Sequence, residues 1–166
     1  MKKHLLIIFF LTVTAIRSQA GGDSAWSMHA GILYSKFSNT DSKVYTGLDL
    51  KAGYQFASMW HTGLAVQLAM LDDNTTSPYL LVAGGPFLRY KPGKVFIDFT
   101  GSIGTATIKK ETITQTTLRL SLGAENNMSE HLFFTPQIYF QYETLPGKRR
   151  SEIWRPGVLL AIRYQF

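Results

Sequence analysis

Apolar and polar residues alternate with a period of two along most of the chain. Between residues 44 and 56, for example, Leu48 and Leu50 alternate with Asp49 and Lys51. Successive side chains of a strand point to opposite faces, so this alternation predicts strands with one apolar and one polar face. Eight such segments follow one another, at 26–34, 44–56, 60–71, 79–90, 95–108, 113–125, 131–143 and 153–166. No amphipathic helix is indicated after residue 20, and the predicted fold class is therefore all-β.

The segment lengths and the connections between them favour a barrel that crosses a membrane. Most segments have roughly 11 to 14 residues, close to what a tilted strand needs to span a bilayer. Their number is even, as it is in bacterial single-chain barrels. Short connections alternate with longer polar ones (57–59, 91–94 and 126–129 against 38–43, 72–78 and 144–152), although the link at 109–112 is compact. Short periplasmic turns and long outer loops would place both ends of the barrel on the periplasmic side.

The bulk of the apolar face distinguishes a membrane barrel from a soluble one. A secreted β-sandwich or lipocalin-like barrel would turn this face inward, but eight strands leave an interior only wide enough for ordinary side chains. The face carries ten large aromatic residues: Trp26, Phe56, Trp60, Tyr90, Phe99, Phe134, Phe140, Trp154, Tyr164 and Phe166. Turned outward, it has aliphatic residues in mid-strand and aromatic residues near the strand ends, Tyr54 among them, as in an interfacial girdle. The sequence thus predicts an antiparallel, eight-stranded, up-and-down transmembrane β-barrel.

The polar face then lines the interior and carries charges of both signs. These charges are four acids and five bases: Asp49, Asp98, Glu125, Glu143, Lys51, Arg89, Arg119, Arg155 and Arg163. Buried charges must be paired, so we expect a network of salt bridges that packs the lumen. The alternative is a narrow gated pore, which eight strands do not leave open without rearrangement.

The first twenty residues have the pattern of a secretory signal peptide. A short basic start (Lys2, Lys3) precedes the apolar run 5–16, and Ser18 and Ala20 supply small residues before a cut. We therefore expect a signal peptide at 1–20 and one barrel domain at 21–166. Cleavage would leave 14 of the 17 basic residues against 11 acidic ones, a net charge of +3 instead of +6. Nucleic acid is not an expected partner, and the absence of cysteine excludes a disulfide framework.

The end of the chain strengthens one resemblance. Leu160, Ile162, Tyr164 and Phe166 alternate up to a terminal phenylalanine. With the signal pattern and the eight segments, this ending resembles the OmpA/OmpX-like family of eight-stranded outer-membrane barrels. The resemblance implies the outer membrane of a Gram-negative-type bacterium, a monomer without cofactor, and outer-membrane lipids and lipopolysaccharide as partners. It also implies that the outer-membrane assembly machinery reads Tyr164 and Phe166.

Candidate chemistry in the barrel is sparse. His29, His61 and His131 are expected inward near the periplasmic ends of non-adjacent strands, which does not predict a metal site. Ser27 and Ser129 lie two residues from a histidine, but at the end away from outer-leaflet lipid A. We therefore expect a non-enzymatic protein with a structural or surface-interaction role. A lipid A-modifying enzyme and a narrow ion-conducting pore are the alternatives.

A basic run in the last predicted outer loop is a possible surface-binding site. Lys148, Arg149 and Arg150 would lie at the level of lipopolysaccharide phosphates, whose charge they complement. A solvated loop without a partner is the alternative.

Overall fold

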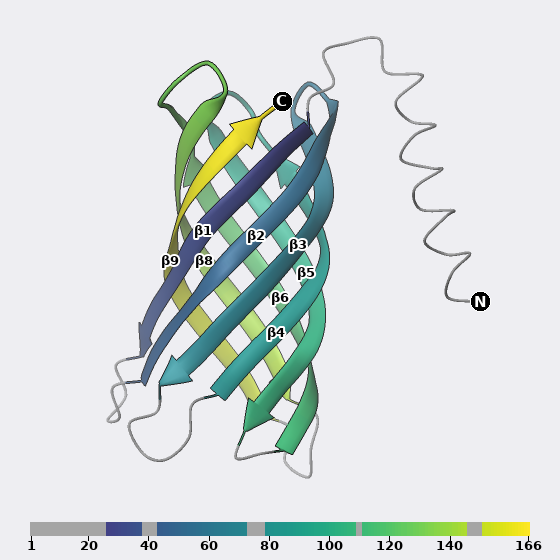
Figure 1. The fold of residues 1–166 in the computed structure, drawn as a ribbon, viewed down its shortest axis with the longest axis vertical. Coiled ribbons are helices and arrows are strands. Elements are labelled where there is room, and N and C mark those ends of the chain that lie inside the picture. The colour runs from purple at the N-terminus through teal and green to yellow at the C-terminus, as the bar shows by residue number, and fades with distance from the viewer. Residues whose placement is uncertain (1–25, 38–42, 73–78, 109–110, 146–150) are drawn as a thin grey trace, which may run out of the picture.

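The computed structural model describes residues 26–37, 43–72, 79–108, 111–145 and 151–166, which form one closed antiparallel barrel (Figure 1). This confirms the predicted fold class. The strands are β1 (Trp26–Phe37), β2 (Lys43–Ala57), β3 (Trp60–Asp72), β4 (Tyr79–Tyr90), β5 (Val95–Ile108), β6 (Glu111–Ala124), β7 (Asn126–Asn127), β8 (Leu132–Leu145) and β9 (Ser151–Gln165). The described part of the chain contains no helix long and apolar enough to cross a membrane. The expected signal peptide at 1–20 lies outside the described residues.

Closure of the wall depends on two pairings, one of which joins the first strand to the last. β1 pairs with β9, and β6 pairs with β8, so the sheet closes on itself. The two-residue β7 continues β6 in the same register, since Gly123 pairs with Gln137 and Asn126 pairs with Phe134. The wall therefore has eight long strands, with β7 as an extension of β6. Closure pairs the strand edges along the wall, which a structure surrounded by lipid requires.

Two of the breaks in the ladders lie at prolines, whereas the register shift between Gln55 and Ala57 of β2 does not. Pro136 lacks an N–H group, and the β6–β8 pairing stops beside it and resumes at β7. Pro86 lies where the β4–β5 pairing skips from Gly84 to Phe87, but its other neighbour, Leu64 of β3, stays paired with it. A proline therefore interrupts one ladder only, and β4 remains a continuous strand even though its sequence is apolar on both faces.

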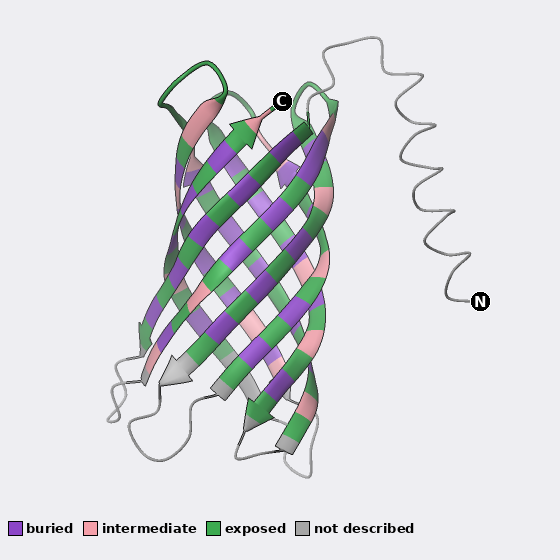
Figure 2. Cartoon of the chain, viewed as in Figure 1, coloured by how far each residue is buried: buried purple, intermediate pink, exposed green. Residues whose placement is uncertain are grey.

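Burial alternates along the strands in the predicted sense (Figure 2). Large apolar residues occupy the outer wall, and most inward positions are polar, charged or small. On β6, for example, Leu118, Leu120 and Leu122 are exposed, whereas Arg119 and Ser121 are buried. The prediction that the bulky apolar face lies outside is confirmed.

The interior also contains large apolar side chains, which the sequence analysis did not expect. Three of its aromatic rings lie on inward glycines. The rings of Phe87, Phe96 and Tyr139 come within 2.4–2.6 Å of the positions that a Cβ would take at Gly53, Gly123 and Gly157, respectively. Eight strands leave an interior only wide enough for ordinary side chains when every inward position carries one. At these three positions the inward residue is glycine, so the neighbouring aromatic ring occupies the space that a side chain would otherwise fill.

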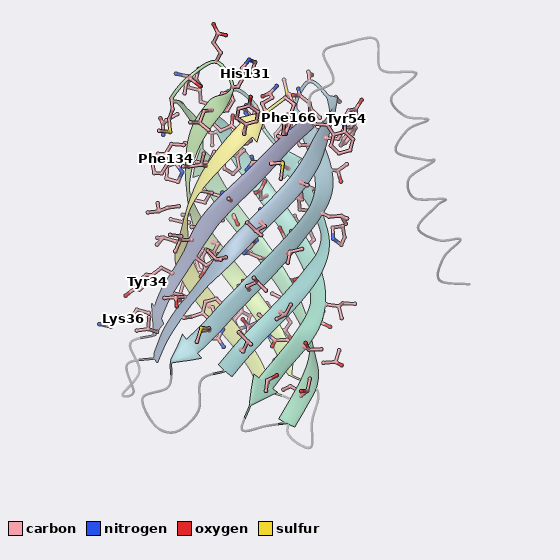
Figure 3. All side chains as sticks on the ribbon, viewed as in Figure 1. Tyr34, Lys36, Tyr54, His131, Phe134 and Phe166 are labelled. Atoms are coloured by element: carbon pink, nitrogen blue, oxygen red, sulfur yellow. The ribbon has the colours of Figure 1, made fainter. Side chains whose placement is uncertain are left out.

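Two aromatic or imidazole side chains are placed differently from the expectation. His131 is exposed, because β8 begins one residue later at Leu132 and leaves His131 in the preceding turn. Figure 3 shows His131 at the turn end of the barrel, and its ring lies 6.1 Å from that of Tyr164. Tyr54 lies on the strand face predicted for the girdle, but it is buried, with its ring 5.3 Å from that of Trp26.

Candidate functional site

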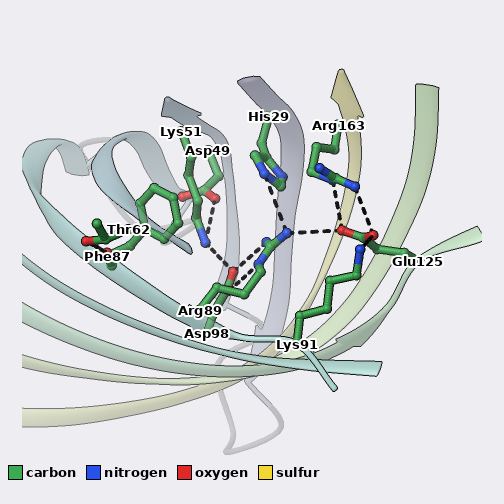
Figure 4. A network of polar contacts seen from close by, with 10 residues as sticks. All are labelled: His29, Asp49, Lys51, Thr62, Phe87, Arg89, Lys91, Asp98, Glu125 and Arg163. Carbon is green, nitrogen blue, oxygen red and sulfur yellow. Dashed lines mark hydrogen bonds and ion pairs between the residues drawn. The ribbon is translucent and has the colours of Figure 1, made fainter. Parts of the chain in front are cut away.

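The interior charges gather first around Asp98, near the end of the barrel where the short turns lie. Asp98 and Arg89 are direct cross-strand partners on β5 and β4. Arg89 donates to both carboxylate oxygens, from Nε at 2.5 Å and from Nη2 at 2.8 Å. Lys51 of β2 donates to the same carboxylate at 2.7 Å (Figure 4). Asp98 is fully buried, so these two cations supply the neutralisation that its burial requires.

Glu125, between β6 and β7, is the second buried carboxylate of this cluster. Arg163 of β9 approaches it with Nη2 at 3.0 Å, and Arg89 reaches it with Nη1 at 3.5 Å. Lys91 of the β4–β5 turn also forms an ion pair with it (Figure 4). His29 Nε2 lies 3.5 Å from Arg89 Nη1, so Arg89 links both carboxylates and the histidine in one network.

The network extends along the interior through Asp49 of β2. Asp49 pairs with Arg119 of β6 and lies 3.7 Å from Lys51 Nζ. Because β2 and β6 are not neighbours in the wall, the Asp49–Arg119 pair crosses the lumen. Such a pair connects opposite sides of the barrel.

Aromatic rings cover two of the guanidinium groups. The Arg89 guanidinium carbon lies 3.9 Å from the ring centre of Phe96, and that of Arg163 lies 4.1 Å from Phe133. Arginine is well suited to this position, since its planar group can stack on a ring and still donate to a carboxylate at its edge.

A separate polar group fills the interior nearer the long connections. Glu143 of β8 accepts from Arg155 Nε at 2.9 Å and from Gln141 Nε2 at 2.6 Å. Gln141 also donates to the hydroxyl of Tyr45 at 3.0 Å, and Gln67 contacts the same hydroxyl. This group connects β2, β3, β8 and β9 across the lumen.

Two buried apolar clusters complete the filling of the barrel. One contains Leu33, Tyr139, Leu159 and Ala161, and the other contains Tyr45, Ala69, Leu81, Ala83 and Ala106. Since charged groups that pair with each other and apolar groups that pack together occupy the same narrow lumen, the interior is a packed core.

The structure places all nine charges of the predicted network in the interior and pairs each with an opposite charge. The sequence analysis missed Lys91, which it had counted as part of a turn. Its position two residues after Arg89 puts it on the same face, and this spacing could have identified it. The candidate surface residues Lys148, Arg149 and Arg150 lie outside the described residues.

The histidine and serine candidates for chemistry that lie in strands of the described ranges are buried in the barrel interior. The described ranges contain no cluster of His, Asp or Glu that could hold a metal ion. His29 and His61 are buried, and His29 faces the Arg89 guanidinium. Ser27 is buried at the same inner wall, with no hydrogen bond to His29 among the described contacts.

The outer wall carries a continuous apolar belt. Four to seven successive outward positions on each long strand are apolar or glycine, and five such positions correspond to a height of about 25 Å for strands tilted by about 40°. Examples in mid-belt are Leu50, Val66 and Leu120, each exposed by 42–50%. Aromatic residues lie at both edges: Trp26, Phe56, Trp60, Tyr164 and Phe166 at the turn end, and Tyr34, Tyr142 and Trp154 at the other.

We expect a charge introduced in the middle of the belt to lower the free energy of unfolding more than a charge placed at the edge of the belt. We expect Leu120→Arg to lower the free energy of unfolding in bilayers by about 2–4 kcal/mol, because the charge would lie near the bilayer midplane. Thr46→Arg, outward on β2 at the aromatic edge of the belt, where Thr46 pairs with Tyr34, should cost about 0–1 kcal/mol. Denaturant unfolding in phospholipid vesicles measures both, and equal costs would contradict the position of the belt.

A closed eight-stranded antiparallel barrel with an apolar outer wall and a charged, packed interior is the architecture of small outer-membrane β-barrels. The chain is similar in structure to Neisserial surface protein A, with a TM-score of 0.55 and 13% identity over 87% of this chain and 100% of that one. It is also similar to a major outer membrane protein from Thermus thermophilus, with a TM-score of 0.53 and 15% identity over the same shares. At these identities the likeness shows the fold. No protein-family model and no curated protein sequence matches the chain.

Proposed function

We propose that the protein is a non-enzymatic, integral outer-membrane β-barrel with a structural or surface-interaction role. The observation that carries this proposal is the apolar belt around a packed interior, which suits a wall in contact with lipid. The names of the two similar structures support the proposed location in the outer membrane, since one is a surface protein and the other an outer membrane protein. A Gram-negative-type cell is the proposed host.

The proposed partners are outer-membrane lipids, lipopolysaccharide and the assembly machinery. Tyr164 and Phe166 support the last of these, because both are exposed on the outside at the end of β9, with ring centres 5.0 Å apart. The backbone N–H of Phe166 donates to Trp26 at 2.9 Å, so the terminal residue is joined to β1. Lys148, Arg149 and Arg150 remain proposed contacts for lipopolysaccharide phosphates. The protein acts as a monomer in this proposal.

Cell fractionation tests the proposal directly. The full chain is expressed in a Gram-negative host, and the outer membrane is separated from the inner membrane and the periplasm. We expect the protein in the outer-membrane fraction, with a gel mobility that changes on boiling as the barrel unfolds. Recovery as a soluble periplasmic protein would contradict the proposal.

The packed interior leads us to expect that the protein does not conduct ions. The Asp49–Arg119 pair and the cluster around Leu33 and Leu159 occupy the lumen at successive levels. Purified protein in planar bilayers should therefore show no single-channel openings at physiological voltage, with protein-free bilayers as the control. Reproducible openings would instead favour the narrow pore.

The surroundings of His29 support the part of the proposal that the protein is not an enzyme. Ser27 and His29 lie inside the barrel at the turn end, where the Arg89 guanidinium faces the imidazole. Lipid A incubated with the pure protein should be recovered with its acyl chains unchanged. Loss or gain of an acyl chain would identify an enzyme.

A further inference from the structure

The outer face of β5 and β6 changes its chemistry toward the end of the barrel away from the short turns. In the belt it carries large apolar residues such as Phe99, Ile103 and Leu118. Beyond them every outward position of the two strands whose side chain the structure describes is a threonine, and all of these are exposed: Thr105, Thr107, Thr112, Thr114 and Thr116. We call these five residues the threonine face.

The strand register arranges the threonine face as a regular array. Thr105 pairs with Thr114 and Thr107 with Thr112, while Thr116 stands opposite Ile103. Cross-strand neighbours have Cβ atoms about 4.5–5.5 Å apart, and residues two apart along a strand lie about 6.6 Å apart. Threonine is branched at Cβ, which restricts its side chain to few rotamers. Its hydroxyl and methyl groups can therefore take only a few orientations on the strand surface.

The inner side of the same hairpin is part of the packed interior. Ala106, between Thr105 and Thr107, is fully buried with Tyr45 and Leu81, and Gln115 is also fully buried. The array is therefore held on the wall of the barrel. Figure 1 shows β5 and β6 reaching past the ends of β1 to β4 on this side.

An aromatic pair marks the level at which the threonine face begins. Tyr142 pairs with both Leu118 of β6 and Trp154 of β9, and its ring lies 4.7 Å from that of Trp154. Tyrosine and tryptophan concentrate at the boundary between hydrocarbon and headgroups. Thr116 is the next outward residue beyond Leu118, and its neighbour on β8 is Thr144. The threonine face thus continues the lipid-facing belt on the headgroup side of its boundary.

We propose that the threonine face binds the core saccharide of an outer-leaflet glycolipid, the part that extends beyond the phosphorylated lipid A headgroup. Its described residues carry no charge, whereas phosphate recognition usually relies on arginine or lysine. Each threonine offers one donor, two acceptor lone pairs and a methyl group. Sugar rings present the matching combination of hydroxyl groups and apolar C–H surface. The proposal rests on the outer-membrane location proposed above.

The test compares valine variants in bilayers of different composition. Valine keeps the branched shape of threonine and removes only its hydroxyl group, so T105V/T114V/T116V should fold normally. T46V is the matched control, since Thr46 is an exposed, outward threonine on β2, away from the hairpin. Each barrel is placed in phosphatidylcholine vesicles alone, with lipid A, or with lipopolysaccharide that has its complete core saccharide. The midpoint of guanidinium unfolding is measured from the fraction with heat-modifiable mobility.

The lipopolysaccharide with core saccharide should raise the unfolding midpoint of the wild type and of T46V more than lipid A does. In the triple variant this additional shift should be lost, with an apparent affinity about tenfold lower, as expected when several hydrogen bonds are removed. The midpoints of all three proteins in phosphatidylcholine alone should coincide.

Three results would overturn the proposal. An unchanged shift in the triple variant would exclude the threonine hydroxyls, and an equal effect of lipid A would assign binding to the phosphorylated headgroup. A higher midpoint of the triple variant in phosphatidylcholine alone would place the threonine face within the hydrocarbon. If no variant inserted into any bilayer, the proposed membrane location itself would be contradicted, which is a distinguishable outcome.

Discussion

Replacing Asp98 with leucine is expected to lower the free energy of unfolding by about 3–5 kcal/mol. Asp98 is fully buried and neutralises both Arg89 and Lys51, so its loss leaves two buried cations without this carboxylate. Denaturant unfolding of the barrel in vesicles, followed by heat-modifiable mobility, measures the change. Removing both members of the closest pair, in Arg89→Met/Asp98→Leu, should cost less than the sum of the single changes.

A partly exposed member of the same network provides the control. The Lys91 side chain is 22% exposed at the turn and pairs with Glu125. Solvent screens such a pair, so Lys91→Ala should cost about 1 kcal/mol or less. A cost below about 1 kcal/mol for Asp98→Leu would show that the buried network does not stabilise the barrel in the way its geometry indicates.

Two adjacent glycines of β4 should differ strongly in their response to the same substitution, with a large loss of stability at Gly85 and little change at Gly84. At Gly85 a Cβ would lie 2.0 Å from the Gly101 carbonyl oxygen and 2.8 Å from the Ser102 Cα. Neither is the end of a flexible side chain, so Gly85→Ala forces the β4 and β5 backbones apart. We expect a loss of about 3 kcal/mol or more, seen as little or no heat-modifiable barrel after refolding.

Gly84 is the matched control, since its side faces outward and the nearest atom to a Cβ there is 3.5 Å away. Gly84→Ala should stay within about 1 kcal/mol of the wild type, because its main effect is to reduce the freedom of the unfolded chain. If both variants refolded equally well, the close approach of β4 and β5 at Gly85 would be wrong.

The sequence predicted the fold because period-two alternation and facing follow from local geometry alone. The same alternation of inward and outward positions predicted that Asp49, Arg119 and Glu143 lie in the interior, although no strand pairing was known. The partners of each charge could not be predicted in this way. The Asp49–Arg119 pair, for instance, joins strands on different sides of the lumen, so it depends on closure and tilt of the whole wall.

Other features could not be predicted from the sequence, because they depend on where a strand pairing ends or on the space that glycines leave in the interior. His131 was expected inside, but the wall beside Pro136 breaks into β6 and β7, and β8 begins only after His131. Phe96 and Tyr139 were not expected to fill the lumen, because the room for them comes from glycines on neighbouring strands. An inward aromatic residue whose cross-strand partner is an inward glycine could serve as a signal for such contacts.

A packed lumen directs any partner to the outside of the barrel and to its loops. The interior charges are paired with one another, from the Asp98 cluster at one end to the Glu143–Arg155 pair nearer the other. The outer wall, by contrast, combines a belt for acyl chains with the threonine face beyond it. Functional variation is therefore expected to reside in outward residues, and inward substitutions should act mainly on stability.

The three native tryptophans test most directly whether the apolar outer wall contacts lipid. Trp26, Trp60 and Trp154 are the only tryptophans in the sequence, and all three are exposed on the outer wall. Refolded barrels are placed in vesicles whose acyl chains carry bromine near the headgroup, and the intrinsic fluorescence is compared with that in unbrominated vesicles. Strong quenching of the emission is the predicted result. Unquenched, water-like emission from a folded barrel would contradict the account.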